Sequence, residues 1–283
     1  MVLVAVTALE WSEAVTEEIT CRLCGAMSTK KFYLRGISGI DIRYFECTNC
    51  ESLQTQEPTW LAKAYGRSNL ADADTGAAQR VLISHAFVVA AVKFFRVRTI
   101  LDFGGGDGLL CRLLRDRGLD AYTVDDYATA TYASLFKGSL ENHYDLITAF
   151  EVFEHLPHPA NELARLFESK PRLVIASTEI YSGQDASWWY LAPGQGQHVF
   201  FYSAKALRLL AQRYQYSYYE INGRHLFSRQ PLTRVRRQAF LRFTSGRVFQ
   251  MFRATLPFSE TWAWVHRDHE IAINDHPPGD DVR

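Results

Sequence analysis

Residues 101–110 read LDFGGGDGLL, and the rest of the chain is organised around this stretch. A short apolar run at residues 97–101 leads into it, and leucines recur after it at the spacing of a helix, at positions 109, 110, 113 and 114. A strand, a glycine-rich turn and a helix start can form a nucleotide cradle, because glycines let the backbone approach a ligand and a helix N-terminus offers unpaired N–H groups.

The spacing of the glycines excludes the usual dinucleotide fingerprint. That fingerprint is GxGxxG, and the two possible starts, at Gly104 and at Gly106, meet Leu109 and Cys111 where the third glycine should stand. The chain has instead the pattern DxGxGxG, formed by Asp102, Gly104, Gly106 and Gly108. On this motif alone, a glycine-rich turn that binds no ligand stays open as the alternative.

Length and composition fit a globular protein with one medium domain and a smaller attachment. The chain has 283 residues, of which 47% are hydrophobic and 22% charged. Lys plus Arg equals Asp plus Glu, at 31 each, which argues against a surface committed to nucleic acid. No apolar run approaches the roughly 20 residues that span a bilayer, so we expect a soluble, cytoplasmic protein. The apolar residues 1–11 lack the basic start of a signal peptide, and we expect a strand or an ordered tail there.

Four of the five cysteines form two CxxC pairs, CRLC and CTNC, separated by 22 residues. Strand-like runs at residues 31–34 and 41–45 lie between them, so each pair sits where a knuckle turn would. This pattern predicts a closed, structural zinc site rather than a disulfide or redox pair. The predicted ligands are Cys21, Cys24, Cys47 and Cys50.

The segments that follow predict alternating helices and strands. We expect a linker at residues 51–74, a helix at 76–95, a second strand at 121–127 that ends in two acids, and a short third strand at 131–136. Asp125 at the end of the second strand can accept hydrogen bonds from ribose hydroxyls, and we prefer it to Asp126. An acidic turn without a ligand is the alternative.

Residues 144–150, YDLITAF, predict a buried strand that runs directly into EVFEHLPHP. Ligands of open α/β sheets gather at the carboxyl ends of strands, so Glu151, Glu154 and His155 fall where chemistry would occur. A helix at 161–168 and a fifth strand at 172–178 are expected next.

LDFGGGDG, TVDD and DLITAFEVFEHLPHP together resemble, in this order, the signature motifs of the class I S-adenosylmethionine (SAM)-dependent methyltransferases. The resemblance implies that Asp102, the three glycines, Asp125 and Glu151 line a SAM site. It also implies that the turn before the first helix closes over the methionine end of SAM, which makes Asp74 and Arg80 candidates. A helix N-cap and a solvated arginine are the alternative for these two residues.

An aromatic loop follows the fifth strand, at residues 185–203, DASWWYLAPGQGQHVFFYS. Aromatic faces stack on sugars and bases, so substrate contacts are predicted here, or alternatively a hydrophobic plug over the sheet. The predicted contacts are Tyr181, Trp188, Trp189 and Tyr190. The run QHVFFYSAKALRLLA also resembles methyltransferases of bacterial sugar and surface-polysaccharide pathways, and Ser203 fits a helix N-cap.

The last part of the chain predicts a hairpin, at residues 216–221 and 225–228 around Asn222 and Gly223, followed by a basic extension. Residues 224–253 contain eight arginines and no acid, with aromatic residues between them. Such a stretch could touch the inner face of an anionic membrane, nucleic acid or a pyrophosphate-linked substrate, or it could be a docked helix pair. Residues 273–283 predict a tail.

We therefore predict an α/β, doubly wound Rossmann-like methyltransferase sheet closed by an antiparallel hairpin. The predicted divisions are a zinc-binding module at 1–57, a SAM-binding domain at 58–230 and a helical extension at 231–283. The expected reaction is methyl transfer to a small molecule, most simply a sugar, nucleotide-sugar or glycan hydroxyl. His198 would be the base, with His155 as the other candidate. An RNA methyltransferase and a non-catalytic binding protein are the alternatives.

Overall fold

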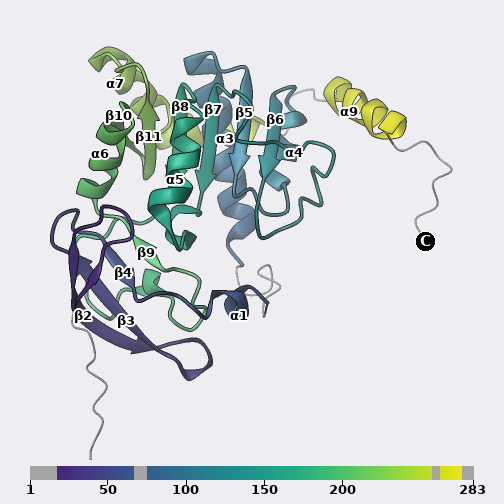
Figure 1. Ribbon diagram of the computed structural model, residues 1–283. Helices are drawn as coiled ribbons and strands as arrows, with labels where there is room; N and C mark the ends of the chain where they lie inside the picture. Colours follow the sequence, from purple (N-terminus) through teal and green to yellow (C-terminus); the bar gives the residue numbers. More distant parts are fainter. Residues whose placement is uncertain (1–17, 67–74, 257–261, 276–283) are drawn as a thin grey trace, which may run out of the picture.

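The computed structural model describes residues 18–66, 75–256 and 262–275, and a six-stranded sheet lies at its centre (Figure 1). The sheet order is β10-β11-β8-β7-β5-β6. Four strands are parallel: β5 (Thr99–Phe103), β6 (Asp120–Val124), β7 (Leu146–Phe150) and β8 (Leu173–Ser177). The hairpin of β10 (Ser217–Ile221) and β11 (Arg224–Ser228) joins the edge of β8 in the antiparallel direction. The predicted sheet and its closing hairpin are confirmed.

Helices cover both faces of this sheet. Side chains alternate along β7, so Leu146 packs against one layer and Ile147 against the other. The first layer contains α3 (Ala77–Phe95), α4 (Leu109–Arg115), α7 (Arg234–Phe243) and α8 (Gly246–Thr255). The second contains α5 (Pro159–Glu168) and α6 (Ala204–Arg213), and Ser203 caps α6 as predicted by accepting a hydrogen bond from the Ala206 N–H.

Helix α3 is the one described helix whose length and apolar composition would let it cross a membrane. The sequence had been expected to contain no apolar run of this length. More than half of it is buried inside the protein, the position of a core helix. The sheet covers one side, and Phe240 of α7 packs against Phe87, Phe94 and Phe95 on the other. The C-terminal extension is therefore a helix pair docked on α3, although Val235 and Met251 remain exposed. Membrane contact through its arginines stays a prediction.

A second, antiparallel sheet carries the two CxxC pairs, with the order β1-β2-β3-β4-β9. Its strands are β1 (Glu18–Thr20), β2 (Met27–Arg35), β3 (Asp41–Cys47), β4 (Leu53–Thr55) and β9 (Phe200–Phe201). Strand β9 comes from the aromatic loop, nearly 150 residues after its partner β4, and pairs Phe200 with Gln54. The predicted division at residue 57 stays a prediction, but this sheet is built from both sides of it.

Two expected segments differ in the structure. Residues 53–55 of the expected linker form the buried strand β4, residues 61–66 form helix α1 (Leu61–Gly66), and residues 67–74 lie outside the described residues, including Asp74. The third strand expected at 131–136 is wrong, because these residues form turns, and Lys137 makes only an isolated bridge to Thr123. The cause is close packing: a Cβ on Gly108 would lie 3.0 Å from the Ala133 Cβ, so this segment folds against the glycine turn.

The described chain ends in α9 (Trp262–Asp275), which includes the first residues of the expected tail. The helix is tied to α4 by the buried carboxylate of Asp268, which accepts hydrogen bonds at 2.8 to 2.9 Å from the guanidinium groups of Arg112 and Arg115. The expectation for residues 1–11 lies outside the described residues.

Candidate active site

The glycine turn follows the carboxyl end of β5. It is tightly packed on the side of Val152 and has open space beside Gly106. Gly104, Gly106 and Gly108 all have left-handed backbones, with φ of 68°, 58° and 81°. A Cβ on Gly104 would lie 2.6 Å from Val152 Cγ2, whereas one on Gly106 would meet no described atom within 4 Å. The turn therefore leaves room for a ligand beside Gly106.

Asp102 supports the turn from below. Its carboxylate is buried, accepts a hydrogen bond from Thr148 Oγ1 at 2.6 Å, and lies directly under Gly105. Burial raises the pKa of Asp102 to about 7, although the hydrogen bond from Thr148 acts in the opposite direction. Its predicted contact with SAM stays a prediction.

Replacing Asp102 with asparagine should remove part of the pH dependence of folding. The carboxyl has an ordinary pKa of 3.8 and a folded-state pKa of about 7, so between these values the native state binds the extra proton and stability falls as pH rises. At about 1.4 kcal/mol per pH unit, the free energy of unfolding of wild type should fall by roughly 3 kcal/mol between pH 5 and pH 8 because of this carboxyl. Asp102→Asn should not show this part of the fall. Urea unfolding at both pH values measures this, and an unchanged difference between the two proteins would contradict it.

Asp125, at the end of β6, holds the neighbouring turn in place. Its carboxylate accepts hydrogen bonds from the backbone N–H groups of Gly106 at 2.9 Å and of Tyr127 and Ala128 at 2.8 Å each. Asp126 is exposed and only 3.9 Å from Arg165. Asp125 thus joins the glycine turn to the second strand, and its role in binding SAM stays a prediction.

Glu151 sits where β7 ends and adopts a left-handed backbone, with φ of 54°. Its carboxylate accepts a hydrogen bond from Ser177 Oγ at 2.5 Å. Burial and then the neighbouring Glu154 raise the pKa of Glu151, while the charge of Arg80 at the start of α3 lowers it. Arg80 therefore lies near enough to influence this end of the sheet, although its side chain is exposed.

Three polar side chains meet just beyond this turn: Glu154, His155 and His198. One potential ligand atom from each lies within 4.8 Å of those of the other two. Glu154 is fully buried and accepts a hydrogen bond from the Tyr190 hydroxyl at 2.7 Å. The rings of His155 and His198 are 4.8 Å apart, centre to centre. The structure thus brings together the two predicted base candidates, 43 positions apart in sequence.

Tyr65 of α1 connects this polar cluster to the cofactor side. Its hydroxyl lies 3.3 Å from His155 Nδ1, and its ring stacks on Tyr127 beside Asp125. Burial, and then the neighbouring His198, lower the pKa of His155 to about 3, so this imidazole is neutral at physiological pH. Tyr65 lies in a segment without periodicity, so the sequence gives no signal for it.

The four predicted aromatic substrate contacts lie in different surroundings. Trp189 is 73% exposed, whereas Trp188 is half-buried against Tyr181 and Phe201. Tyr190 is buried on Glu154, and Tyr181 is buried with its hydroxyl donating to Glu46 of β3 at 2.7 Å. The loop therefore packs against the cysteine-bearing sheet and presents Trp189 to solvent. Contact with substrate stays a prediction for all four.

The four cysteines of the CxxC pairs form one cluster. Their sulfur atoms lie within 4.8 Å of one another, with 3.7 Å between Cys21 and Cys50 and 3.5 Å between Cys24 and Cys47. Tetrahedral zinc with bonds of about 2.3 Å separates its sulfur ligands by roughly 3.8 Å. The hydrogen bond between the two thiols lowers the pKa of Cys21 and raises the pKa of Cys50. The cluster fits zinc.

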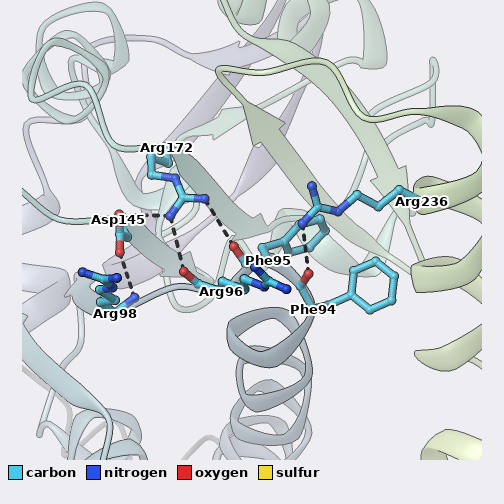
Figure 2. A pocket seen from close by; sticks show the side chains of 7 residues that line it. All are labelled: Phe94, Phe95, Arg96, Arg98, Asp145, Arg172 and Arg236. Carbon is cyan, nitrogen blue, oxygen red and sulfur yellow. Dashed lines mark hydrogen bonds and ion pairs between the residues drawn. The ribbon is translucent and has the colours of Figure 1, made fainter.

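A cavity of about 730 Å³ lies at the opposite, amino edge of the sheet and is lined by arginines (Figure 2). Two of its guanidinium groups hold neighbouring segments together: Arg172 donates to the Phe95 carbonyl at 3.3 Å and to Asp145 at 3.3 Å, and Arg236 donates to the Phe94 carbonyl at 3.0 Å. These arginines cap the C-terminal end of α3, where cations are favoured. The cavity is therefore separate from the site at the carboxyl edge.

An open, mostly parallel sheet with a glycine turn at the end of its central strand and an acid at the end of the next defines a class I SAM-dependent methyltransferase fold. The sequence pattern of the family described as "Methyltransferase domain" matches residues 77–221, just over half of the chain, so this protein belongs to that family. It is a SAM-dependent methyltransferase.

Solved structures of methyltransferases are similar to it at low identity. The methyltransferase domain of bacterial CtHen1 is 24% identical over 52% of this chain and 97% of its own, with a TM-score of 0.39. Magnesium protoporphyrin IX methyltransferase (ChlM) from Synechocystis PCC 6803 is 16% identical over 61% and 93%, with a TM-score of 0.44. PigF is 19% identical over 59% and 61%, with a TM-score of 0.46. The search of curated proteins found no match.

Proposed function

We propose that this enzyme methylates a hydroxyl oxygen of a small polar acceptor of the sugar class, which includes nucleotide-sugars and glycans. The observation that carries the proposal is the polar cluster of Glu154, His155 and His198, which lies directly beyond the strand end where ligands of open sheets bind. A hydroxyl must lose its proton to become a good nucleophile, and imidazole and carboxylate groups are suited to promoting that loss.

The loop that carries His198 also supports an acceptor of this class. Exposed Trp189 packs on Tyr190, which in turn contacts the His198 ring at 4.5 Å between centres. An exposed indole next to a polar cluster can stack on the apolar face of a sugar while the cluster reaches its hydroxyl. The zero net charge fits a small acceptor better than nucleic acid.

We infer that SAM binds at the glycine turn and the strand ends beside it. The Gly104–Gly108 turn gives room for the nucleoside, Asp125 would receive its ribose, and Glu151 and Arg80 lie toward the methionine end. SAM supplies an electrophilic methyl carbon when bound. The protein accelerates the reaction by holding the acceptor oxygen in line with that carbon. We infer in addition that zinc occupies the four-cysteine cluster as a structural ion, and that the enzyme works in the cytoplasm.

His198→Ala should lower turnover by at least 100-fold while SAM affinity stays within about threefold of wild type, because the cluster activates the acceptor and the glycine turn holds SAM. Release of S-adenosylhomocysteine measures turnover with nucleotide-sugars, simple phenols and ribosomal RNA fragments as acceptors, and calorimetry measures SAM binding. His158→Ala is the matched control, since this nearby histidine is exposed and faces Glu57 at 3.8 Å.

Each result of this test decides between the functions. Turnover with sugar-class acceptors alone supports the proposal, turnover with phenols alone would contradict the sugar class, and turnover with RNA alone would replace the proposal with the RNA methyltransferase. Absence of SAM binding would favour the non-catalytic protein. Loss of SAM binding in His198→Ala would show that this residue serves the cofactor and not the acceptor.

A further inference from the structure

We propose that Glu154, His155 and His198 bind a divalent transition-metal ion, at a site distinct from the four-cysteine cluster. The potential ligand atoms of the three side chains lie within 4.8 Å of one another. Metal bonds of about 2.0–2.2 Å to nitrogen and oxygen bring ligand atoms to separations of roughly 3–4.4 Å. Small side-chain rotations are enough to close the present arrangement around an ion.

Glu154 supplies the second, independent observation. Its side chain is fully buried, and while Oε1 accepts the hydrogen bond from Tyr190, Oε2 has no hydrogen-bond partner among the described residues. Leaving a carboxylate oxygen buried and unpaired costs several kcal/mol unless a cation compensates. A bound metal ion between Glu154 and the two histidines would satisfy this oxygen.

His198 is already oriented as a metal-bound imidazole usually is. His198 Nδ1 lies 2.6 Å from the Tyr190 carbonyl, which can only accept, so this nitrogen carries the proton and Nε2 keeps a free lone pair. The Tyr65 hydroxyl lies 3.3 Å from Nδ1 of His155, and either of these two atoms can be the donor. Such outer hydrogen bonds fix the tautomer and orientation of metal-bound imidazoles.

The backbone around His198 is held rigidly, which suits a preformed site. Val199 donates a hydrogen bond from its N–H to the Glu154 carbonyl at 2.8 Å. The Val199 carbonyl accepts from the guanidinium of Arg22, within the first CxxC pair, at 2.7 Å and from the Thr55 N–H at 3.1 Å. The cysteine-bearing sheet thereby fixes His198 relative to the turn that carries the other two ligands.

The ligand set indicates which ions the site takes. Two imidazoles and one carboxylate favour Zn²⁺, Fe²⁺, Co²⁺ or Mn²⁺ over Ca²⁺, and they leave coordination positions open. The four-cysteine cluster has no open position and suits a structural ion. Resting on the proposed function, we infer that the open positions hold the acceptor hydroxyl and lower its pKa, with the proton released to solvent. The histidines then act as ligands rather than as the base.

The test is a titration with Mn²⁺ of the full-length protein holding one zinc ion per chain, so that only the four-cysteine cluster is filled, and the electron paramagnetic resonance signal of free Mn²⁺ follows the binding. Hard Mn²⁺ does not compete well for four thiolates, so we expect one ion per chain in addition to the zinc. Glu154→Gln, which keeps the hydrogen bond from Tyr190, and His198→Ala should each weaken Mn²⁺ binding at least tenfold. His158→Ala should bind as wild type does.

A Co²⁺ spectrum gives a second readout. Co²⁺ bound at this site to the zinc-loaded protein should show ligand-field bands without the thiolate charge-transfer band that cysteine ligands produce. No Mn²⁺ or Co²⁺ binding by wild type, or unchanged binding by folded Glu154→Gln and His198→Ala, would overturn the proposal. Metal binding without turnover on any acceptor would refute the proposed function while the site stands, and full turnover after the ion is removed would refute the site's role in catalysis.

Discussion

Replacing Gly105 with alanine should weaken SAM binding by one to two orders of magnitude. The added Cβ would lie 2.2 Å from Thr123 Oγ1 and 2.7 Å from Asp102 Oδ2, two buried side chains that cannot withdraw. Overpacking of this kind costs about 1–3 kcal/mol, and the turn can relieve it only by moving toward the space where the ligand would lie. Calorimetric titration with SAM measures the change.

Gly223→Ala is the matched control for this substitution. Gly223 also has a left-handed backbone, with φ of 71°, but a Cβ there would meet no atom of the described residues within 4 Å, and the residue lies in the β10–β11 turn. The control should lose some stability and keep its affinity for SAM. If folded Gly105→Ala binds SAM as tightly as wild type, the glycine turn does not form the cofactor cradle.

Replacing Cys50 with serine should abolish zinc binding and lower methyl transfer by at least 100-fold, while SAM binding persists. Cys50 is fully buried in the four-cysteine cluster, and its carbonyl accepts a hydrogen bond from Ser203, just after β9. Binding of a structural zinc ion contributes on the order of 10 kcal/mol to the fold around it. Without the ion, the sheet that holds Val199 and His198 loosens, whereas the glycine turn belongs to the other sheet.

Zinc content by elemental analysis, SAM affinity and turnover are measured together for this variant. Cys111→Ser is the control, because Cys111 is equally buried but lies in α4, outside the cluster. It should keep its zinc and its turnover. A zinc-free Cys50→Ser enzyme with undiminished turnover would show that the cysteine-bearing sheet plays no part in placing His198.

The sequence was sufficient for the central sheet because each of its signals is local. Apolar runs predicted β5, β7 and β8, and the Asn222–Gly223 turn predicted the hairpin. The CxxC spacing likewise predicted the cysteine cluster, since knuckle geometry depends on only a few neighbouring residues. The expected strand at 131–136 failed because packing against Gly108 overrides a short apolar run, and that contact joins distant positions.

The polar cluster could be predicted only in part for the same reason. Both histidines were candidates, but their meeting depends on β9 pairing with β4, and a two-residue strand has no periodic signature. Tyr65 and the unpaired oxygen of Glu154 likewise depend on tertiary packing. Asp102 is the opposite case: the motif predicted a contact with SAM, which stays a prediction, and the structure shows a buried side chain packed under Gly105.

The pairing of β9 with β4 also limits how this enzyme can be engineered. Residues 1–57 cannot be exchanged as a block for the corresponding part of another methyltransferase, because the incoming sheet would lack a matching edge for Phe200 and Phe201. A chimera would have to take both the N-terminal segment and residues 189–203 from the same donor protein. We therefore expect the acceptor preference of this protein to be transferred to another methyltransferase only when both segments are exchanged together.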